Sequence, residues 1–146
     1  MSDIVEVVDR NIQAWRSKDF DSYFGCYRED AAIVAPGGVR AQGREGIGRF
    51  MSLWENAAPD NSIEFLDRYS VGSVVVHEGV FRGTHTGDLL SWDGQALPAT
   101  GRTFELTYCE VFVVVDGLIT EQRLYFDQMQ LLTQLGVAPG GETTAP

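Results

Sequence analysis

The stretch that decides the fold is Thr103–Asp127, TFELTYCEVFVVVDGLITEQRLYFD. In its middle, Asp116-Gly117 lies between two runs rich in β-branched and aromatic residues. An Asp-Gly pair in that setting is typical of the two-residue type I′ turn of a β-hairpin. The stretch therefore predicts two long antiparallel strands, Thr103–Val115 and Leu118–Asp127.

A tight turn also predicts which side chains face one another across the hairpin. If pairing continues from Val115 opposite Leu118, one face carries Phe112 opposite Glu121, Glu110 opposite Arg123, Tyr108 opposite Tyr125, and Leu106 opposite Asp127. This mixture of rings, carboxylates, phenols and a guanidinium suits an apolar pocket with polar groups at defined points. It also suits a face in water, where an ion pair contributes little. A bulge or a one-residue slip would exchange the two faces.

In the rest of the chain, most of the predicted helices come before the long strands. Period-2 alternation predicts strands at Ser62–Val71 and Ser73–Thr86, with a loop at Gly87–Gly101 before the hairpin. Apolar spacing predicts the remaining elements: a helix from Ile4 to Trp15, a short helix carrying Phe20 to Tyr27, a strand at Ala31–Val34, a helix at Gly43–Trp54, and a helical turn at Met129–Leu135. Helices followed by long strands are typical of an α+β fold with helices on one face of a curved antiparallel sheet.

Composition limits the function classes. The chain has 146 residues, which favours a single domain, here 1–136, followed by a flexible Gly-, Pro- and Thr-rich tail at 137–146. Its net charge of −10 argues against a nucleic-acid partner or a lipid surface. No apolar run is long enough for a membrane span, the N-terminus does not resemble a signal peptide, and the two cysteines match no zinc site. We therefore expect a cytoplasmic domain that acts on a small molecule or a protein.

The two histidines lie on one predicted strand. His77 and His85 share a face with Phe81 by parity, but eight strand residues separate them by roughly 26 Å. A lone histidine at such a position is more often structural than catalytic. No two metal-ligating residue types occur at ligand spacing, so the sequence predicts no metal site.

Several motifs together resemble one family. They are Gly83-Thr84-His85-Thr86-Gly87, Pro98-Ala99-Thr100-Gly101-Arg102, Val115-Asp116-Gly117-Leu118-Ile119-Thr120-Glu121, Asp127, and Gln134-Leu135-Gly136. In these elements the chain resembles the SnoaL-like polyketide cyclases, which belong to the superfamily of nuclear transport factor 2 and ketosteroid isomerase. The resemblance covers the chain to about Gly136. It implies a cone-shaped fold, in which the curved sheet wraps around N-terminal helices and encloses a pocket, and a homodimer.

The resemblance also implies an activity and a site. In these cyclases an Asp at the end of the last strand is the general acid/base of an intramolecular aldol cyclisation, and the matching residue here is Asp127. The cyclases have a His partner near this Asp, which the last two strands here lack, so His85, Tyr108 or Glu110 would take its place. The substrate, a small hydrophobic or polycyclic product of secondary metabolism, would contact Trp15, Tyr27, Trp54, Phe81, Phe104, Leu106, Glu110, Phe112, Arg123 and Tyr125. No metal or organic cofactor is expected.

Two alternatives remain open at the level of sequence. The first is another enzyme on the same cone, namely a dehydratase, an isomerase or an epoxide hydrolase. The second is a non-catalytic dimeric domain that binds a hydrophobic ligand. The aromatic residues on the helices also have a simpler interpretation, because such rings more often pack in a core than contact a substrate.

Overall fold

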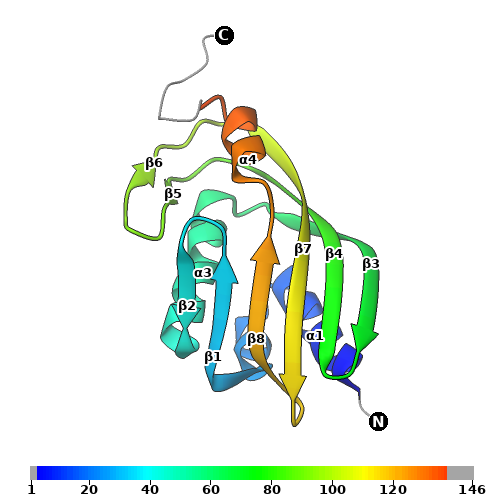
Figure 1. Cartoon of the computed structure of the whole chain (residues 1–146). Helices are drawn as coiled ribbons and strands as arrows, with labels where there is room; N and C mark the ends of the chain where they lie inside the picture. The colour runs from blue at the N-terminus through cyan, green and yellow to red at the C-terminus, as the bar shows by residue number, and fades with distance from the viewer. Residues whose placement is uncertain (1–2, 138–146) are drawn as a thin grey trace.

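A computed structural model describes residues 3–137 of the chain (Figure 1). Its elements are α1 (Ile4–Arg16), α2 (Phe20–Gly25), β1 (Tyr27–Ala35), β2 (Val39–Gln42), α3 (Gly43–Ala57), β3 (Ser62–Val71), β4 (Val74–Thr84), β5 (Leu89–Leu90), β6 (Ala96–Leu97), β7 (Thr103–Val115), β8 (Leu118–Tyr125) and α4 (Gln128–Gln134). Residues 138–146, most of the predicted tail, lie outside the described range. Val137, which the sequence assigned to that tail, is buried.

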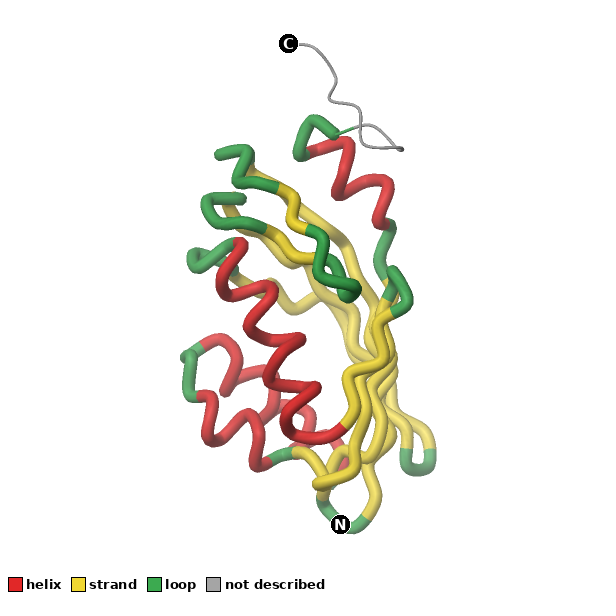
Figure 2. Tube along the Cα trace, turned by 90° about the vertical axis from the view of Figure 1, so that its left-hand side faces the viewer, coloured by secondary structure: helices red, strands yellow, loops and turns green. Residues whose placement is uncertain are grey.

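The long strands form one sheet with the order β2-β1-β8-β7-β4-β3. Helices α1, α2 and α3 lie together on one side of this curved sheet (Figure 2). The sheet is mixed, whereas the sequence predicted an antiparallel one: β8 pairs antiparallel with β7 but parallel with β1. The hairpin turn makes β8 antiparallel to β7. In the sheet β8 lies between β7 and β1, and it runs in the same direction as β1.

The core lies between the helices and the concave face of the sheet. Val8 of α1 and Ile47 of α3 pack there with Ile33, Phe112 and Ile119 of the sheet, and all five are almost fully buried. Burying each such side chain stabilises the fold by about 1.5–3 kcal/mol. No helix in residues 3–137 combines the length and the apolar character needed to cross a membrane.

Two local predictions differ from the structure. Tyr27 begins β1 instead of ending the second helix, because the chain leaves the helix at Cys26, whose carbonyl accepts a hydrogen bond from Ile119 N. The segment expected as a plain loop, Gly87–Gly101, contains a small hairpin made of β5 and β6. We call the segment Gly87–Gly101 the flap.

The Asp-Gly turn of the long hairpin is confirmed. Asp116 and Gly117 have φ values of 52° and 80°, which a type I′ turn requires. Pairing starts as predicted, with Val115 opposite Leu118, and then Thr120 is bulged out of the ladder.

The predicted faces are wrong beyond this bulge, because one extra residue in β8 turns every later side chain of that strand to the other face. Glu110 therefore lies opposite Leu124 and not Arg123, and Cys109 lies opposite Tyr125. Since Val113 now pairs with Glu121, the faces of β8 are exchanged relative to those of β7.

Candidate active site

A cavity of about 70 Å³ lies between α1, α3 and the concave face of the sheet. Most of its walls are aromatic or aliphatic, and a few polar groups reach it. The lining residues are Asn11, Ile12, Trp15, Tyr23, Phe50, Trp54, Ile63, Phe81, Leu106, Tyr108, Glu110, Gln122, Leu124 and Phe126. We call this space the inner cavity.

Strand alternation explains which sheet residues reach the inner cavity. On β7, Leu106, Tyr108 and Glu110 face the helices, because successive side chains of a strand point to opposite faces. On β8, the bulge directs Gln122 and Leu124 to the same side. The bulge at Thr120 thus decides which polar side chain of β8 enters the cavity.

A line of hydrogen bonds connects the polar groups around the cavity. The hydroxyls of Tyr23 and Tyr27 lie 3.1 Å apart, and Tyr27 donates to Gln122 Oε1 at 2.5 Å. The amide of Gln122 donates in turn to Glu110 Oε1 at 2.6 Å, and His77 Nδ1 lies 3.3 Å from Glu110 Oε2. Each oxygen of the Glu110 carboxylate therefore has one partner that holds it in place, and retains a lone pair.

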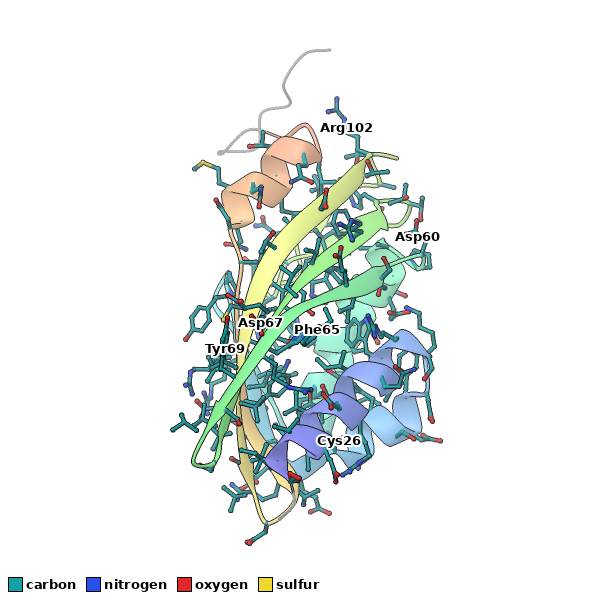
Figure 3. All side chains as sticks on the ribbon, turned by 90° about the vertical axis from the view of Figure 1, so that its right-hand side faces the viewer. Cys26, Asp60, Phe65, Asp67, Tyr69 and Arg102 are labelled. Atoms are coloured by element: carbon teal, nitrogen blue, oxygen red, sulfur yellow. The ribbon has the colours of Figure 1, made fainter. Side chains whose placement is uncertain are left out.

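Aromatic rings enclose the Glu110–His77 pair. The side chains are 12% and 3% exposed, respectively. The imidazole stacks on Phe65 of β3 at 5.9 Å and meets the edge of Tyr108 at 5.6 Å. Figure 3 shows Phe65 on β3, the strand at the edge of the sheet. A carboxylate held in such a low-dielectric site interacts more strongly with a bound substrate than it would in water.

Tyr108 lies beside this carboxylate and remains a hydrogen-bond donor. Burial, together with the negative charge of Glu110, holds the pKa of the Tyr108 phenol well above its ordinary value. Its ring depends on Gly79 of β4, because a Cβ atom there would lie 2.8 Å from the Tyr108 hydroxyl oxygen and 2.9 Å from Cζ. The absence of a side chain at Gly79 therefore leaves the space that the Tyr108 phenol occupies.

Six of the site residues predicted from the sequence line the inner cavity: Trp15, Trp54, Phe81, Leu106, Tyr108 and Glu110. Tyr27 does not line the inner cavity, but its hydroxyl contacts two residues that do, Tyr23 and Gln122. Phe104 and Phe112 are buried in the core and do not line the inner cavity.

The other predicted site residues lie elsewhere, and the bulge explains three of them. Arg123 pairs with Glu121 at 2.6 Å instead of Glu110, and Tyr125 is 53% exposed on the convex face. Asp127 follows the end of β8 and is exposed; its Oδ1 accepts hydrogen bonds from Met129 N at 3.0 Å and Gln130 N at 3.2 Å. Asp127 is thus the N-cap of α4, and the prediction that it shares a face with Tyr108 is wrong.

His85 has a structural environment. It is buried just beyond β4, and its Nδ1 accepts a hydrogen bond from Thr100 N at 3.2 Å. Burial lowers the pKa of the imidazole. The hydrogen bond from Thr100 therefore connects the end of the flap to His85. His85 does not line the inner cavity.

The sequence did not predict Gln122, which lines the inner cavity, or His77, which contacts Glu110 behind it. The signal for His77 was present, since parity placed it on one face with Phe81, but its pairing with Glu110 depends on the register between β4 and β7. The face of Gln122 could not be predicted, because the alternation of apolar and polar residues along β8 does not show that Thr120 forms a bulge. Within residues 3–137 no group of three or more His, Cys, Asp or Glu side chains could hold a metal ion.

Comparison with known proteins identifies the family. A model of the SnoaL-like polyketide cyclases matches residues 5–135. Among solved structures, IdmH from Streptomyces antibioticus, a provisionally assigned polyketide cyclase, is 28% identical, with a TM-score of 0.76 over 93% of this chain and 100% of its own.

Two more distant structures share the fold. A provisionally assigned SnoaL-like polyketide cyclase from Jannaschia sp. CCS1 is 18% identical, with a TM-score of 0.82 over 98% of this chain and 92% of its own. A protein with a ketosteroid isomerase-like fold from Catenulispora acidiphila is 19% identical, with a TM-score of 0.74 over 92% and 94% of the two chains. No match is found among curated proteins. The match over residues 5–135, nearly the whole described structure, shows that the chain belongs to the SnoaL-like polyketide cyclase family.

Proposed function

We propose that the protein catalyses acid/base chemistry next to a carbonyl group of an apolar organic substrate, with Glu110 as general base. The observation that carries the proposal is that, within residues 3–137, Glu110 is the only carboxylate that lines the inner cavity. Its partners Gln122 and His77 hold the carboxylate in one orientation. A base that is positioned in this way typically contributes about 10²–10⁴-fold to a rate.

The proposed reaction is an intramolecular aldol cyclisation, as the family name suggests. Glu110 removes a proton from the carbon next to one carbonyl, and the C–H electron pair forms an enolate. The enolate carbon attacks a second carbonyl carbon of the same molecule, which forms the new ring bond. The resulting alkoxide takes the proton back from Glu110, so the enzyme returns to its starting state. This sequence requires no metal or organic cofactor.

Tyr108 supplies the donor that the enolate needs. Its burial keeps the phenol protonated, so it can donate a hydrogen bond to the oxygen on which negative charge develops. Glu110 and Tyr108 both line the inner cavity, from alternate positions of one strand, which suits a proton acceptor and a donor that act on adjacent atoms.

Asp127 is the second candidate for the acid/base group. The resemblance to the family favours it, because it occupies the matching place in the sequence. The hydrogen bonds favour Glu110, because Asp127 would have to leave two backbone amides of α4 before its carboxylate could act in the cavity.

The proposal is tested by proton exchange, which needs no knowledge of the natural substrate. The probe is 4-acetylbiphenyl in D₂O, and NMR measures deuterium entering the methyl group beside its carbonyl. We expect the native protein to accelerate this exchange and Glu110→Gln to lose at least about 100-fold of the acceleration. Binding of the ketone without any exchange would overturn the proposal, and would favour a domain that only binds hydrophobic ligands.

We also propose that the protein is a homodimer that associates through the convex face of its sheet. Val71 is 76% exposed and Tyr69 is 53% exposed on that face, and Figure 3 shows Tyr69 pointing away from the helices. Val111 and Val113 of β7 continue the same face and are half-buried. A contiguous apolar patch of this kind often marks a protein interface.

A further inference from the structure

The hydroxyl group of Tyr27 on β1 lies between two other polar side chains in the interior. Its oxygen is 2.5 Å from Gln122 Oε1 and 3.1 Å from the Tyr23 hydroxyl, and all three side chains are buried. Tyr27 does not line the inner cavity, so a substrate there would not touch it. Its place in this line of hydrogen bonds indicates what it does instead.

The direction of each hydrogen bond in the line follows from the Glu110 carboxylate. An ionised carboxylate only accepts, so the Gln122 amide must turn its NH₂ group to Glu110 Oε1, 2.6 Å away. The amide oxygen then faces Tyr27 and also accepts, so the single hydroxyl proton of Tyr27 is donated to it. This leaves the Tyr27 oxygen to accept from the Tyr23 hydroxyl. Every bond in the line therefore points toward Glu110.

The two phenols are held in the protonated form, in which they can donate. Burial raises the pKa of Tyr23 and the pKa of Tyr27, and the charge of Glu110 acts in the same direction on both. The Asn11 amide acts against this shift at Tyr27 without reversing it. The Tyr27 hydroxyl is therefore a permanent donor to the Gln122 amide.

A permanent donor behind Gln122 matters most when Glu110 binds a proton. The neutral carboxyl group can donate, and a freely rotating Gln122 amide could turn its oxygen toward that proton and hold it. With Tyr27 present, the same rotation requires the hydroxyl protons of Tyr27 and Tyr23 to reorient as well. The hydroxyl of Tyr27 thus favours the arrangement in which Glu110 accepts, and this is the arrangement of the ionised base.

The other titratable or charged groups near Glu110 act from different sides. On β4, His77 contacts the second carboxylate oxygen at 3.3 Å, and Arg68 of β3 lies opposite His77 in the sheet. Tyr108 is the neighbour on β7, and the charge of Arg16 on α1 acts on it. None of these groups contacts the Gln122 amide by a hydrogen bond, so a change at Tyr27 leaves their contacts with Glu110 in place.

We propose that Tyr27 is a positioning residue that acts through the Gln122 amide and keeps the Glu110 carboxylate ionised, ready to accept a proton. This inference rests on the proposed function, in which Glu110 is the general base. It gives Tyr27 a role different from the substrate contact that the family resemblance implied.

The test measures the pH at which Glu110 binds a proton, by carbon-13 NMR of its side-chain carboxyl carbon. The signal is identified by its absence from Glu110→Gln. Tyr27→Phe keeps the ring and removes the hydroxyl, and we expect it to move the titration midpoint up by at least about half a pH unit, because the ionised form loses support. Tyr125→Phe makes the same change at an exposed position and should leave the midpoint in place. An unchanged midpoint in Tyr27→Phe would overturn the proposal.

A second variant shows whether the effect passes through Gln122. Gln122→Met keeps the length of the side chain and removes the amide, so it should raise the midpoint by itself. Adding Tyr27→Phe to Gln122→Met should then change the midpoint by less than about 0.2 pH unit, because no amide remains to be oriented. Equal shifts in the two backgrounds would show that Tyr27 acts by another route, and would contradict the proposal.

The titration needs no substrate, so it is independent of the proposed reaction. A native protein that exchanges no deuterium, but shows the shift and its loss in Gln122→Met, would overturn the proposed function and leave the effect of Tyr27 on Glu110 established.

In a protein that does exchange, the acid side of the pH–rate profile for 4-acetylbiphenyl should move up by the same amount in Tyr27→Phe. The rate at the plateau should stay within about threefold of native, because Glu110 is ionised there in both proteins. A lower plateau with an unmoved acid side would indicate that Tyr27 supports only the structure, and would contradict the proposal.

Discussion

At the residue scale, the proposed chemistry depends on how two side chains of β7 are held. Glu110 receives one hydrogen bond from Gln122 and lies against His77, and Tyr108 occupies the space that Gly79 leaves open. None of these contacts lies between neighbours in sequence, so each depends on the pairing of the strands. The site is thus a product of the sheet register.

Tyr108→Phe removes the donor and leaves the ring in place. We expect the exchange rate of 4-acetylbiphenyl to fall by about 10²–10³-fold, the usual cost of losing one donor to a developing oxyanion. Affinity for the ketone should change little, because the ring still lines the cavity. A loss of affinity with an unchanged rate would instead indicate a role in binding alone.

Gly79→Ala tests whether Tyr108 needs its present position. The added methyl group would lie 2.8 Å from the phenol oxygen and 2.9 Å from the carbonyl oxygen of Glu64. We expect reduced stability in chemical denaturation and a reduced exchange rate. Adding Tyr108→Phe to this variant removes only the contact with the hydroxyl oxygen, so partial recovery of stability would show that the phenol is one source of the strain.

At the scale of elements, the flap depends on His85. Its Nδ1 accepts from Thr100 N, and burial lowers the pKa of the imidazole despite the nearby charge of Asp88, which acts in the opposite direction. The unfolded chain therefore binds a proton more readily than the native chain does. Above about pH 6.5 this group does not affect stability, and below it the free energy of unfolding falls as pH decreases toward the lowered pKa.

His85→Asn checks this linkage, because asparagine keeps an acceptor near the position of Nδ1 but does not titrate. We expect the native protein to lose more unfolding free energy than the variant between pH 7.5 and pH 5, as measured by denaturant titration. Identical losses in the two proteins would show that His85 is not responsible.

The long hairpin shows what a sequence can predict about this fold. The Asp116-Gly117 turn and the face of β7 that carries Tyr108 and Glu110 follow from local patterns, and both are confirmed as structure. The residues contributed by β8 could not be predicted, because one bulged residue, Thr120, reverses the parity of the strand after it. His77 could be assigned to a face but not to a partner, since its partner lies on another strand.

At the scale of the whole molecule, helices α1, α2 and α3 cover only one face of the sheet (Figure 2). If the convex face is a dimer interface, a charge at its centre should separate the subunits. Val113→Arg is suited to this, because Glu121 lies opposite and can pair with the new guanidinium in the monomer. We expect sedimentation equilibrium to give twice the chain mass for the native protein and the single mass for the variant.

Thr133→Arg, on an exposed position of α4, is the control and should stay dimeric. A native protein that sediments as a monomer would contradict the proposed interface, and so would a Val113→Arg protein that remains dimeric.

The measurement that tests the central claim most directly compares Glu110→Gln with Asp127→Asn in the deuterium exchange of 4-acetylbiphenyl. Both changes remove a carboxylate and keep its shape, and asparagine is as good an N-cap as aspartate, so α4 should remain intact. The proposed role of Glu110 predicts a loss of about 10²–10⁴-fold for Glu110→Gln and a rate within about threefold of native for Asp127→Asn. Exchange that persists in Glu110→Gln and disappears in Asp127→Asn would contradict it.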